Sequence, residues 1–572
     1  MKIIGINSEY DASMNKVYSG SCALIVDGEI VYALAEDRIS REKDDGGFED
    51  SLKYILNKVN LSIVQIDYFY ISFYGNSVIP TDKMISHHLG LLGLNDHPEK
   101  LVLMPSHHFS HAVAAYFLSP FNEAIIMIAD NEGNLLSPGS EAEKKIEDCY
   151  CERNSYYWAR GNCISLIERD FEMPSEVGFG KAYNMFNNYI GFGNYLTVGK
   201  TMGLSSYGKL EGNLNNADIW KIDENGKLHS NIVETNDLIK DVERFLKLSN
   251  IKLPDRQGEK LYELPEYKNL AYFIQEQLNK WSAQKLKFLM KKVKINNVCI
   301  SGGVGLNGIM NEYIEKSLDV QVFVPPYPSD PGQALGNAIY GYITQIGKNN
   351  NSSIPKVSFD GCTYLGSEYS NDEILQIIEK NSKDFKIKFK HPNNITEVVA
   401  ELLAKGKIIG WFQGRSEYGA RALGNRSIIA DPRSIEISDR VNLLKRRELF
   451  RPLAPSVLSE YKSEYFEGTD DSLLDKFMLS VKKVKIAKTN EIKGVVHVDN
   501  TSRIQEVSKK DNEKYYDLIE QFRKITGIPM ILNTSFNMAG EPIVESPDDA
   551  IKAFLEIGLD YLVCGEILIE RQ

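Results

Sequence analysis

The sequence predicts a protein of two α/β domains, and three observations lead to this prediction. The chain has 572 residues, 43% of them hydrophobic and 25% charged, so it is long enough to bury more than one core. Its first forty residues read as successive β-strands. Further along, strand patterns alternate with helix patterns, which is the order expected of an α/β fold.

The first domain is predicted to begin with a β-meander. Strand-like runs cover residues 2–7, 22–26 and 30–35. Asp27-Gly28, between the last two runs, is a strong signal for a hairpin turn. A related strand pattern returns at residues 124–129, 156–159 and 163–167, which favours two related α/β halves within this domain.

The boundary between the domains is predicted at residues 347–357. This stretch is rich in Asn and Ser and has the composition of a surface linker. The domains would then cover residues 1–346 and 358–572. The second domain begins its own α/β pattern with a helix predicted at 396–404 and a strand at 408–412.

The bulk composition disfavours several classes of protein. A net charge of −12 argues against a general nucleic-acid binder, because affinity for a phosphate backbone comes mostly from clustered Lys and Arg. Seven cysteines without a Cys-x-x-Cys pair argue against a disulfide framework or a cysteine zinc site. The sequence shows neither a signal-peptide pattern nor an apolar run that could span a bilayer. We therefore expect a cytoplasmic protein that binds no nucleic acid and no membrane.

His107 and His111 are candidate metal ligands. They lie four residues apart after Ser106, a helix-capping residue, so both imidazoles should leave one face of a helix. The spacing alone favours a pair of structural histidines. Asp130 and Asp330 add to the case, because each follows an apolar strand at the end where α/β sheets place their sites. Two imidazoles with one or two carboxylates suit a divalent first-row metal such as iron, with zinc or manganese as alternatives. The alternative for both aspartates is that they cap helices or loops.

Two glycine-rich segments are candidate phosphate loops. One covers residues 199–208, and the other covers residues 301–307, after a helix predicted at 270–292 and a short strand. Glycines let backbone amides approach phosphates, and a following helix N-terminus adds a favourable potential. Neither segment is a Walker A loop. For each one alone, a tight turn between packed elements is an equally good interpretation.

A local anion site is predicted in the second domain. Residues 413–427 carry Arg415, Arg421 and Arg426 among small residues, and residues 445–452 add four more positive charges. A basic run is usually a solvated face. Here Phe450 and the apolar residues after it indicate a buried surround, where cations without an anionic partner are costly. Arginine suits bidentate phosphate contacts and lysine adds a point charge.

Taken together, these segments resemble the NodU/TobZ-type carbamoyltransferase family along nearly the whole chain. The motifs that carry the resemblance are His107-His108-x-x-His111-Ala112, Gly199-Lys200-x-Met202-Gly203-Leu204, Gly302-Gly303-Val304-Gly305-Leu306-Asn307, Gln413-Gly414-Arg415 through Arg426-Ser427, Lys445 through Pro455, and Asn533-Thr534-Ser535-Phe536-Asn537. Several long motifs in one order make the resemblance specific.

The resemblance implies an N-terminal TsaD-like domain of the actin/sugar-kinase/Hsp70 fold and a C-terminal YrdC-like α/β domain. In the family, the YrdC-like domain converts carbamoyl phosphate and ATP to carbamoyl-adenylate. The TsaD-like domain holds nucleotide and iron while the carbamoyl group passes to an acceptor hydroxyl. The implied cofactors are ATP with Mg(II), and Fe(II) or another divalent metal. The implied acceptor is a small natural product of secondary metabolism, such as an aminoglycoside antibiotic, a macrolide or a signalling sugar.

The implied site residues follow from a residue-to-residue match. The metal would be surrounded by His107, His111, Asp130 and Asp330. Nucleotide in the first domain would contact Gly199, Lys200, Gly203, Gly302, Gly303 and Asn307. Carbamoyl phosphate and its adenylate would be held by Arg415, Arg421, Lys445, Arg451, Asn533, Ser535 and Asn537. Of these, Arg421, Lys445 and Arg451 would also be catalytic.

The chain departs from the family pattern at three places. Where the family has His-Asp-Ala-Ser before the second strand, this chain has Tyr18-Ser19-Gly20-Ser21, and the alternative alignment to Tyr10 also gives tyrosine. We assign Tyr18 a catalytic role, although a tyrosine with a pKa of about 10 is a poorer general base near neutrality than a histidine. The acceptor would then be activated by the metal, or would be an amine or thiol. The other departures are Asp130-Asn131-Glu132-Gly133 for Asp-Gly-x-Gly, and Ala420 for proline.

Two other functions remain open. An enzyme that makes threonylcarbamoyl-modified tRNA would use the same two domain types, but the acidic net charge weighs against it. A nucleotide-binding regulator without catalysis is suggested by the missing histidine, whereas the intact set of cations argues for an enzyme.

Overall fold

The computed structural model describes most of the chain, and its contacts divide the chain into two compact units. The described residues are 1–10, 15–74, 81–136, 150–171, 176–235, 237–254, 256, 260–349, 359, 361–468 and 472–572. The first unit contains Met1–Val31 and Gly46–Ser358, and the second contains Tyr32–Asp45 and Phe359–Gln572. Most of the predicted linker, 347–357, lies outside the described residues, as does Cys149.

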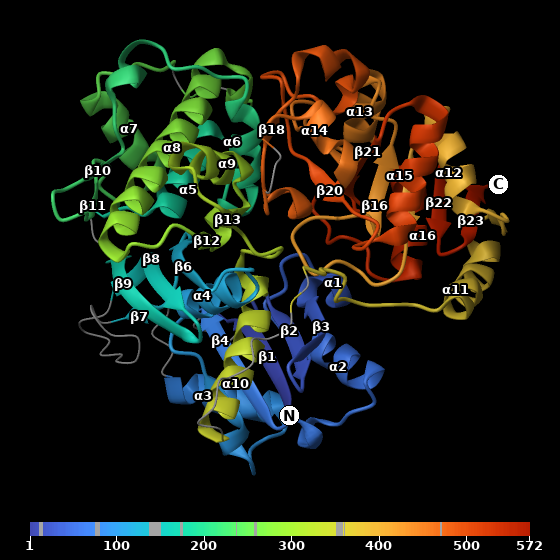
Figure 1. The fold of residues 1–572 in the computed structure, drawn as a ribbon, viewed down its shortest axis with the longest axis horizontal. Helices are drawn as coiled ribbons and strands as arrows, with labels where there is room; N and C mark the ends of the chain where they lie inside the picture. Colours follow the sequence, from blue (N-terminus) through green and yellow to red (C-terminus); the bar gives the residue numbers. More distant parts are fainter. Residues whose placement is uncertain are drawn as a thin grey trace. The chain divides into compact units, whose positions relative to one another are not determined.

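The first sheet of the first unit is the predicted meander, extended by two parallel strands (Figure 1). Its spatial order is β3-β2-β1-β4-β5, with the bounds β1 Lys2–Glu9, β2 Ser21–Val26, β3 Glu29–Ala35, β4 Tyr68–Tyr74 and β5 Leu101–Leu103. Asp27 and Gly28 both have positive φ, at 50° and 91°, which confirms the predicted hairpin turn. Helix α10 (Gln333–Asn349) packs against β1 and against α4 (His107–Phe117).

The second sheet of the first unit places two strand ends side by side. Its order is β13-β12-β6-β8-β7, with β9 paired to β8, and the bounds are β6 Glu123–Ala129, β7 Leu135–Leu136, β8 Tyr150–Arg160, β9 Cys163–Phe171, β12 Val298–Ser301 and β13 Val322–Phe323. Strands β6 and β12 run parallel, with Ile128 opposite Ser301. Because parallel strands end at the same edge of a sheet, Asp130 and Gly302, which follow these strands, lie at one edge.

The remaining elements of the first unit are mostly helices. Its other helices are α2 Glu49–Lys58, α3 Thr81–Leu92, α5 Phe179–Ile190, α6 Val198–Ser205, α7 Leu238–Leu248, α8 Pro265–Val293 and α9 Gly308–Leu318, and β10 Trp220–Ile222 pairs with β11 Leu228–Ser230. The prediction of a helix at 270–292 is confirmed, since α8 covers these residues. Among the described residues, no helix is both long and apolar enough to cross a membrane.

The second unit is built on one mixed sheet of eight strands. The order is β14-β23-β22-β15-β16-β21-β17-β20, with the bounds β14 Ile387–Lys390, β15 Ile409–Phe412, β16 Arg426–Ala430, β17 Ala454–Leu458, β20 Gln505–Val507, β21 Met530–Ser535, β22 Tyr561–Cys564 and β23 Ile567–Arg571. Its longer helices are α11 Asn371–Asp384, α12 Ile395–Ala404, α13 Ile435–Leu444, α15 Glu513–Thr526 and α16 Pro547–Ile557, and a small ladder joins β18 Lys482–Lys483 to β19 Thr501–Ser502. The predicted helix at 396–404 and strand at 408–412 are both found. The α/β class is therefore confirmed for both units.

The segment Tyr32–Asp45 belongs to the second unit because its arginines are bound there. The segment contains the short helix α1 (Glu36–Ser40). Arg38, which is buried, pairs with the buried Glu545 at 3.4 Å and donates to the carbonyl oxygen of Gly419. Arg41 donates to the carbonyl oxygens of Pro542 and Ile543 at 3.0 and 2.6 Å. These bonds place a piece of the N-terminal sequence inside the second unit.

Candidate metal centre and anion site

Helix α4 carries the two candidate imidazole ligands. Ser106 caps the helix and accepts a hydrogen bond from the Phe109 amide at 3.1 Å, as the sequence predicts. The His107 amide donates to Asn134 Oδ1 at 2.7 Å, which fixes the start of the helix. Both imidazoles are buried, with His107 1% and His111 0% exposed, so they point into the protein rather than into solvent.

Two aspartates complete a compact group with these histidines. One ligand atom from each of His107, His111, Asp130 and Asp330 lies within 4.8 Å of the others. Asp330 Oδ1 lies 3.2 Å from His107 Nε2 and 3.1 Å from His111 Nε2. Asp130 Oδ2 lies 3.5 Å from His111 Nε2. The structure thus brings together the four residues that the sequence predicts as metal ligands.

The second sheet and the turn before α10 hold the aspartates in place. The Gly303 amide donates to Asp130 Oδ2 at 3.1 Å. Ser301 Oγ donates to the carbonyl oxygen of Pro328 at 3.0 Å and lies 3.3 Å from His111 Nδ1, so it can accept a hydrogen bond from that nitrogen. This contact leaves His111 Nε2 as the nitrogen that faces the carboxylates. A backbone carbonyl and a hydroxyl thereby orient the imidazole, as is common around metal ligands.

In the absence of a metal ion, a proton on His111 balances the negative charge of the carboxylates. Burial lowers the pKa of His111, but its bonds to Asp130 and Asp330 outweigh burial and raise the pKa to about 9. Burial raises the pKa of Asp330, but His107 and His111 hold it well below its usual value. In the metal-free protein, protonated imidazole therefore balances the carboxylates. Two imidazole nitrogens and two carboxylate oxygens also fit a divalent first-row metal ion.

Gly302 is required beside this group, which leads to a testable prediction. Its φ is +85°, and a Cβ there would collide with the carbonyl oxygen of Ala129. Gly302→Ala should lower the free energy of unfolding by about 2–4 kcal/mol. It should also weaken metal binding about tenfold, because the neighbouring Gly303 amide would leave Asp130. Urea unfolding and metal titration test this, with Gly90→Ala as the matched control because that position has open space around it. Equal effects at both glycines would contradict the prediction.

Tyr18 lies against a second tyrosine. Its ring meets the ring of Tyr195 edge-on, with centroids 5.2 Å apart. Burial, a hydrogen bond with Tyr18 and the carboxylates of Glu9 and Asp330 all raise the pKa of Tyr195. Tyr195 therefore keeps its proton and acts as a hydrogen-bond donor, not as a base. The influence of Asp330 also places this pair of phenols near the candidate metal group.

The first glycine-rich segment is not a loop, which corrects the expectation from the sequence. Residues Val198–Ser205 form helix α6, with Gly199 and Lys200 in its first turn and the buried Gly203 in its second. Lys200 Nζ lies 5.7 Å above the ring of Phe192. Small residues allow this short helix to pack closely against α8. The amides of its first turn remain the part of this segment that suits an anion.

The second glycine-rich segment does form a turn after a strand. Residues Gly303–Leu306 make a single 3-10 turn, and Asn307 then caps α9. Asn307 Oδ1 accepts from the Met310 amide at 3.0 Å, and its Nδ2 donates to Gln275 at 2.9 Å. Asn307 therefore has a structural task beside its predicted contact with nucleotide.

The departure at Asp130-Asn131-Glu132-Gly133 produces a local charge network. Glu132 lies 2.9 Å from Arg153 and 2.8 Å from Lys181. Glu234 binds the same two cations, at 3.2 and 2.9 Å. Two carboxylates therefore balance two cations, and the group as a whole carries no net charge.

The anion site predicted in the second unit lies where several strands begin or end together. Strand β21 ends at Ser535, which pairs with Ser427 of β16, and Ala454 of β17 pairs with Asn533 of β21. Strand β20 starts beside β17. The loops before β16, β17 and β20 and the loop after β21 therefore meet at one edge of the sheet.

Five cations from these loops form what we call the cation cluster. Its members are Arg421, Lys445, Arg447, Arg451 and Arg503. Burial, followed by the charge of Arg451, lowers the pKa of Arg421 to about 10. Burial and neighbouring arginines also lower the pKa of Arg447 to about 9, and hold the pKa of Lys445 and Arg503 well below their usual values. The five groups therefore repel one another in the absence of a ligand.

Few acidic groups balance the cation cluster. Among the described residues, Glu448 is the carboxylate that pairs with one of its members, at 3.9 Å from Arg451 Nη1. The Lys445 ammonium instead donates to backbone oxygens of Ser535 and Asn537 and to Asn537 Oδ1, the last at 3.1 Å. The Nε atoms of Arg421, Arg447 and Arg503 are buried without a hydrogen-bond partner. Since buried cations need counter-charge, this geometry fits a ligand with several negative charges.

Two of the arginines predicted to need an anionic partner, Arg426 and Arg415, are bound by carbonyl oxygens and aromatic rings, and Glu545 and Glu417 add counter-charge near Arg426. Arg426 is fully buried and donates to the carbonyl oxygens of Gln413, Gly414, Ser367 and Asn425, and its guanidinium lies 3.7 Å from the ring centre of Phe412. Arg415 donates to the carbonyl oxygen of Leu365 at 2.7 Å and stacks on Tyr32. Carbonyl dipoles and aromatic faces satisfy these guanidiniums, and the structure does not place Arg415 among the cation cluster.

Sequence reasoning missed two members of the cation cluster. Arg447 belongs to the basic run at residues 445–452 but not to the predicted site residues, and none of the motifs includes Arg503. Arg503 stands alone between Ser502 and Ile504, with no local run of charge to mark it. The available signal was an arginine two residues before strand β20, beside the buried Ile504.

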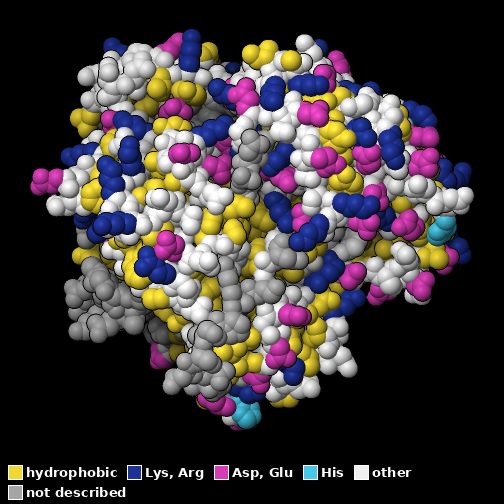
Figure 2. Space-filling view, in the orientation of Figure 1, with side chains coloured by type: hydrophobic (Ala, Val, Ile, Leu, Met, Phe, Trp, Pro, Cys, Tyr) yellow, Lys and Arg dark blue, Asp and Glu magenta, His cyan; other side chains and the backbone are white. Residues whose placement is uncertain are grey.

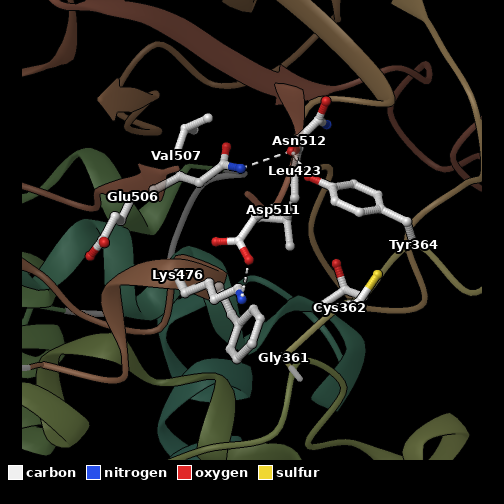
Figure 3. Close-up of a pocket in the computed structure, with 12 residues that line it drawn as sticks. Gly361, Cys362, Tyr364, Leu423, Lys476, Glu506, Val507, Asp511 and Asn512 are labelled. Carbon is white, nitrogen blue, oxygen red and sulfur yellow. Dashed lines mark hydrogen bonds and ion pairs between the residues drawn. The ribbon is translucent and has the colours of Figure 1, made fainter. Parts of the chain in front are cut away.

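A small pocket lies behind the loop that bears Arg421 (Figure 3). Lys476 and Asp511 face each other across it at 2.7 Å. Gln505 at its wall donates to the carbonyl oxygen of Leu423 and also accepts a hydrogen bond from Asn533 Nδ2 at 2.9 Å. Asn533, predicted to bind carbamoyl phosphate, is thus anchored from this side, while its Oδ1 is buried without a partner.

Two family models and several relatives match this chain, the relatives over nearly its whole length. One family model, described as Carbamoyltransferase N-terminus, matches residues 81–339, and another, described as Carbamoyltransferase C-terminus, matches residues 400–571. Nodulation protein NolNO of Sinorhizobium fredii is 31% identical over 97% of this chain and 79% of its own length. An uncharacterized protein of Methanocaldococcus jannaschii is 31% identical over 97% of this chain and 98% of its own. Full-length HypF in a phosphate- and nucleotide-bound form is 11% identical, covers 59% of this chain and 54% of that chain, and has a TM-score of 0.33.

Proposed function

The chain belongs to the carbamoyltransferase family, and from this premise we propose that it activates the carbamoyl group with ATP and transfers it to a small-molecule acceptor. The second unit would form carbamoyl-adenylate from carbamoyl phosphate and ATP. The first unit would pass the carbamoyl group to a hydroxyl of a natural product. The observation that carries this proposal is the cation cluster, whose five basic side chains have one paired carboxylate, Glu448, in the part of the chain that the structure describes.

The stoichiometry defines what the cation cluster must bind. Water cleaves carbamoyl phosphate to carbamate and phosphate, and a carbamate oxygen then attacks the α-phosphorus of ATP. Carbamoyl-adenylate forms and pyrophosphate leaves. Every species in this sequence except water is an anion, and negative charge grows on the leaving oxygens. Fixed cations in a site closed to water suit such a reaction, because they stabilise this charge without reorganising.

The metal group of the first unit supports the transfer step. His107, His111, Asp130 and Asp330 would hold a divalent ion such as Fe(II), which when bound would serve as a Lewis acid that lowers the pKa of the acceptor oxygen. Tyr18 and Tyr195 would position the acceptor through their hydroxyl groups. The acceptor oxygen would form its bond to the carbamoyl carbon, and AMP would leave with the electron pair of the broken C–O bond. This arrangement reduces the need for the histidine that the family has at position 18.

The charge distribution supports a small acceptor over tRNA. The net charge is −12, and on the face drawn in Figure 2 the side chains of Lys and Arg are interspersed with those of Asp and Glu. A tRNA-modifying enzyme would need an extended basic surface. Five basic side chains of this chain gather instead in the cation cluster, where burial suits a small anionic ligand.

The adenylation step can be tested without knowing the acceptor. Purified protein is incubated anaerobically with ATP, Mg(II), carbamoyl phosphate and Fe(II), and AMP and pyrophosphate are followed. We expect both products to depend on carbamoyl phosphate, and to fall at least about 100-fold in Arg451→Ala. Arg440→Ala is the matched control, since Arg440 is an exposed arginine of the same unit paired with Asp560. A protein that binds ATP and forms no AMP would refute the proposed reaction.

A further inference from the structure

An uncharged side chain, His497, borders the cation cluster. His497 and Arg503 flank β19, and the loop between them is closed by a hydrogen bond from the His497 amide to the carbonyl oxygen of Thr501 at 2.8 Å. The imidazole interacts electrostatically with Arg503, and Arg503 in turn interacts with Arg421, Arg447 and Arg451. These interactions, together with the closed loop between the two residues, place His497 near Arg503.

The imidazole of His497 is neutral and offers a lone pair. Burial lowers the pKa of His497 to about 4; Asp499 opposes this shift only in part, and Arg503 adds to it. At neutral pH one ring nitrogen therefore carries a hydrogen and the other is a hydrogen-bond acceptor. His497 Nε2 is buried and has no hydrogen-bond partner. A buried polar atom without a partner costs free energy, so a ligand atom is expected to meet it.

Among the described residues, the buried acceptor atoms near the cation cluster that have no partner are His497 Nε2, Asn533 Oδ1 and Asn442 Oδ1. Guanidinium and ammonium groups have only donors, so the cation cluster can bind any phosphate but cannot recognise an N–H group. Carbamoyl phosphate carries an –NH2 group next to its carbonyl carbon. Acetyl phosphate has nearly the same shape and the same phosphate, with a methyl group in place of –NH2. A site built from cations alone would therefore bind the two compounds about equally.

We propose that His497 Nε2 accepts a hydrogen bond from the –NH2 group of carbamoyl phosphate and thereby selects it over acetyl phosphate and inorganic phosphate. This inference rests on the proposed function, because it assigns the cation cluster to carbamoyl phosphate. It makes His497 a specificity-determining residue of the second unit. The guanidiniums provide affinity for the phosphate, and the imidazole identifies the group attached to it.

The test compares affinities for three phosphates in matched variants. The proteins are wild type, His497→Phe, His497→Gln and the control Arg440→Ala. The measurements are the KM for carbamoyl phosphate in AMP formation and the inhibition constants of acetyl phosphate and inorganic phosphate. His497→Phe should raise the KM about 10–100-fold and leave both inhibition constants within about threefold. His497→Gln, whose side-chain amide restores an acceptor near the Nε2 position, should recover most of the loss.

Several outcomes would overturn the inference. Parallel increases of all three constants in His497→Phe would show that His497 only positions Arg503. An unchanged preference in His497→Phe would assign the –NH2 group to another acceptor, such as Asn533 Oδ1. Direct binding by calorimetry separates this inference from the proposed reaction. Wild type could form no AMP and still bind carbamoyl phosphate at least tenfold more tightly than acetyl phosphate, with this preference lost in His497→Phe. That result would support recognition by His497 and refute the proposed adenylation reaction. Equal binding of both compounds to wild type would overturn the recognition.

Discussion

Arg503→Met should strongly slow adenylate formation and at the same time make the ligand-free protein more stable. Three other arginines, Arg421, Arg447 and Arg451, repel the partly buried side chain of Arg503, whose buried Nε has no hydrogen-bond partner. Replacing a buried charge of this kind by an apolar side chain of similar length commonly stabilises a protein by about 1–4 kcal/mol. Loss of one preorganised cation from the reaction centre should lower kcat/KM for carbamoyl phosphate by about 100–1000-fold.

Two measurements on the same protein check this prediction. Scanning calorimetry without ligand should give a higher unfolding temperature than wild type, whereas the stabilisation by added pyrophosphate should be smaller. Arg440→Met serves as control, because Arg440 is 44% exposed and its pair with Asp560 should be worth little. A less stable Arg503→Met protein would mean that Arg503 has a structural partner in the free state. If Arg503→Met kept its adenylation activity, Arg503 would have no role in the adenylation site.

Asp330→Asn should separate the two half-reactions. Asp330 Oδ1 lies within 3.2 Å of both imidazoles, so its charge holds the metal group together. The amide keeps the shape but loses the charge, and metal affinity should fall by more than about 100-fold. Adenylate formation in the second unit should stay within about twofold of wild type, whereas carbamoyl transfer should be lost. Metal content by mass spectrometry and AMP formation with and without acceptor measure both effects. If Asp330→Asn lost adenylation activity as well as its bound metal, the assignment of the two steps to separate units would be wrong.

Metal binding should also release a proton. The pKa of His111 is raised to about 9, so its imidazole is protonated at pH 7 in the metal-free protein and must lose that proton to coordinate a metal. Apparent affinity should therefore rise about tenfold per pH unit until about pH 9, and then level off. Calorimetry at pH 7 in two buffers of different ionisation enthalpy should detect about one proton released per ion. No release at pH 7 would show that His111 is neutral beforehand or is not a ligand.

The sequence predicted features that depend on neighbours along the chain. Asp27-Gly28 specifies a hairpin turn, Ser106 caps a helix, and the spacing of His107 and His111 places both on one helical face. Local chemistry sets each of these, so a single sequence is enough. The meeting of these histidines with Asp330 was predicted by strand-end reasoning, because parallel strands bring distant residues to one sheet edge.

Features that depend on distant packing could not be read from the sequence. Arg421 and Arg426 lie in the same sequence motif, yet four carbonyl oxygens and an aromatic ring bind Arg426, while Arg421 lies among other cations. Only the fold decides which surroundings each receives. Gly199 was expected in a loop but lies in α6, because packing against α8 outweighs the low helix propensity of glycine.

The attachment of Tyr32–Asp45 to the second unit limits how the protein can be divided. A fragment that starts after residue 358 would lack Arg38 and Arg41. The buried Glu545 would then lose the cation that pairs with it. The carbonyl oxygens of Pro542 and Ile543 would lose the hydrogen bonds that Arg41 donates. The gene segment for the C-terminal half therefore does not encode all the residues of the second unit. During synthesis the second unit can complete its fold only around residues that left the ribosome hundreds of codons earlier. Recombination or truncation at the apparent linker would separate Arg38 and Arg41 from the groups they bind.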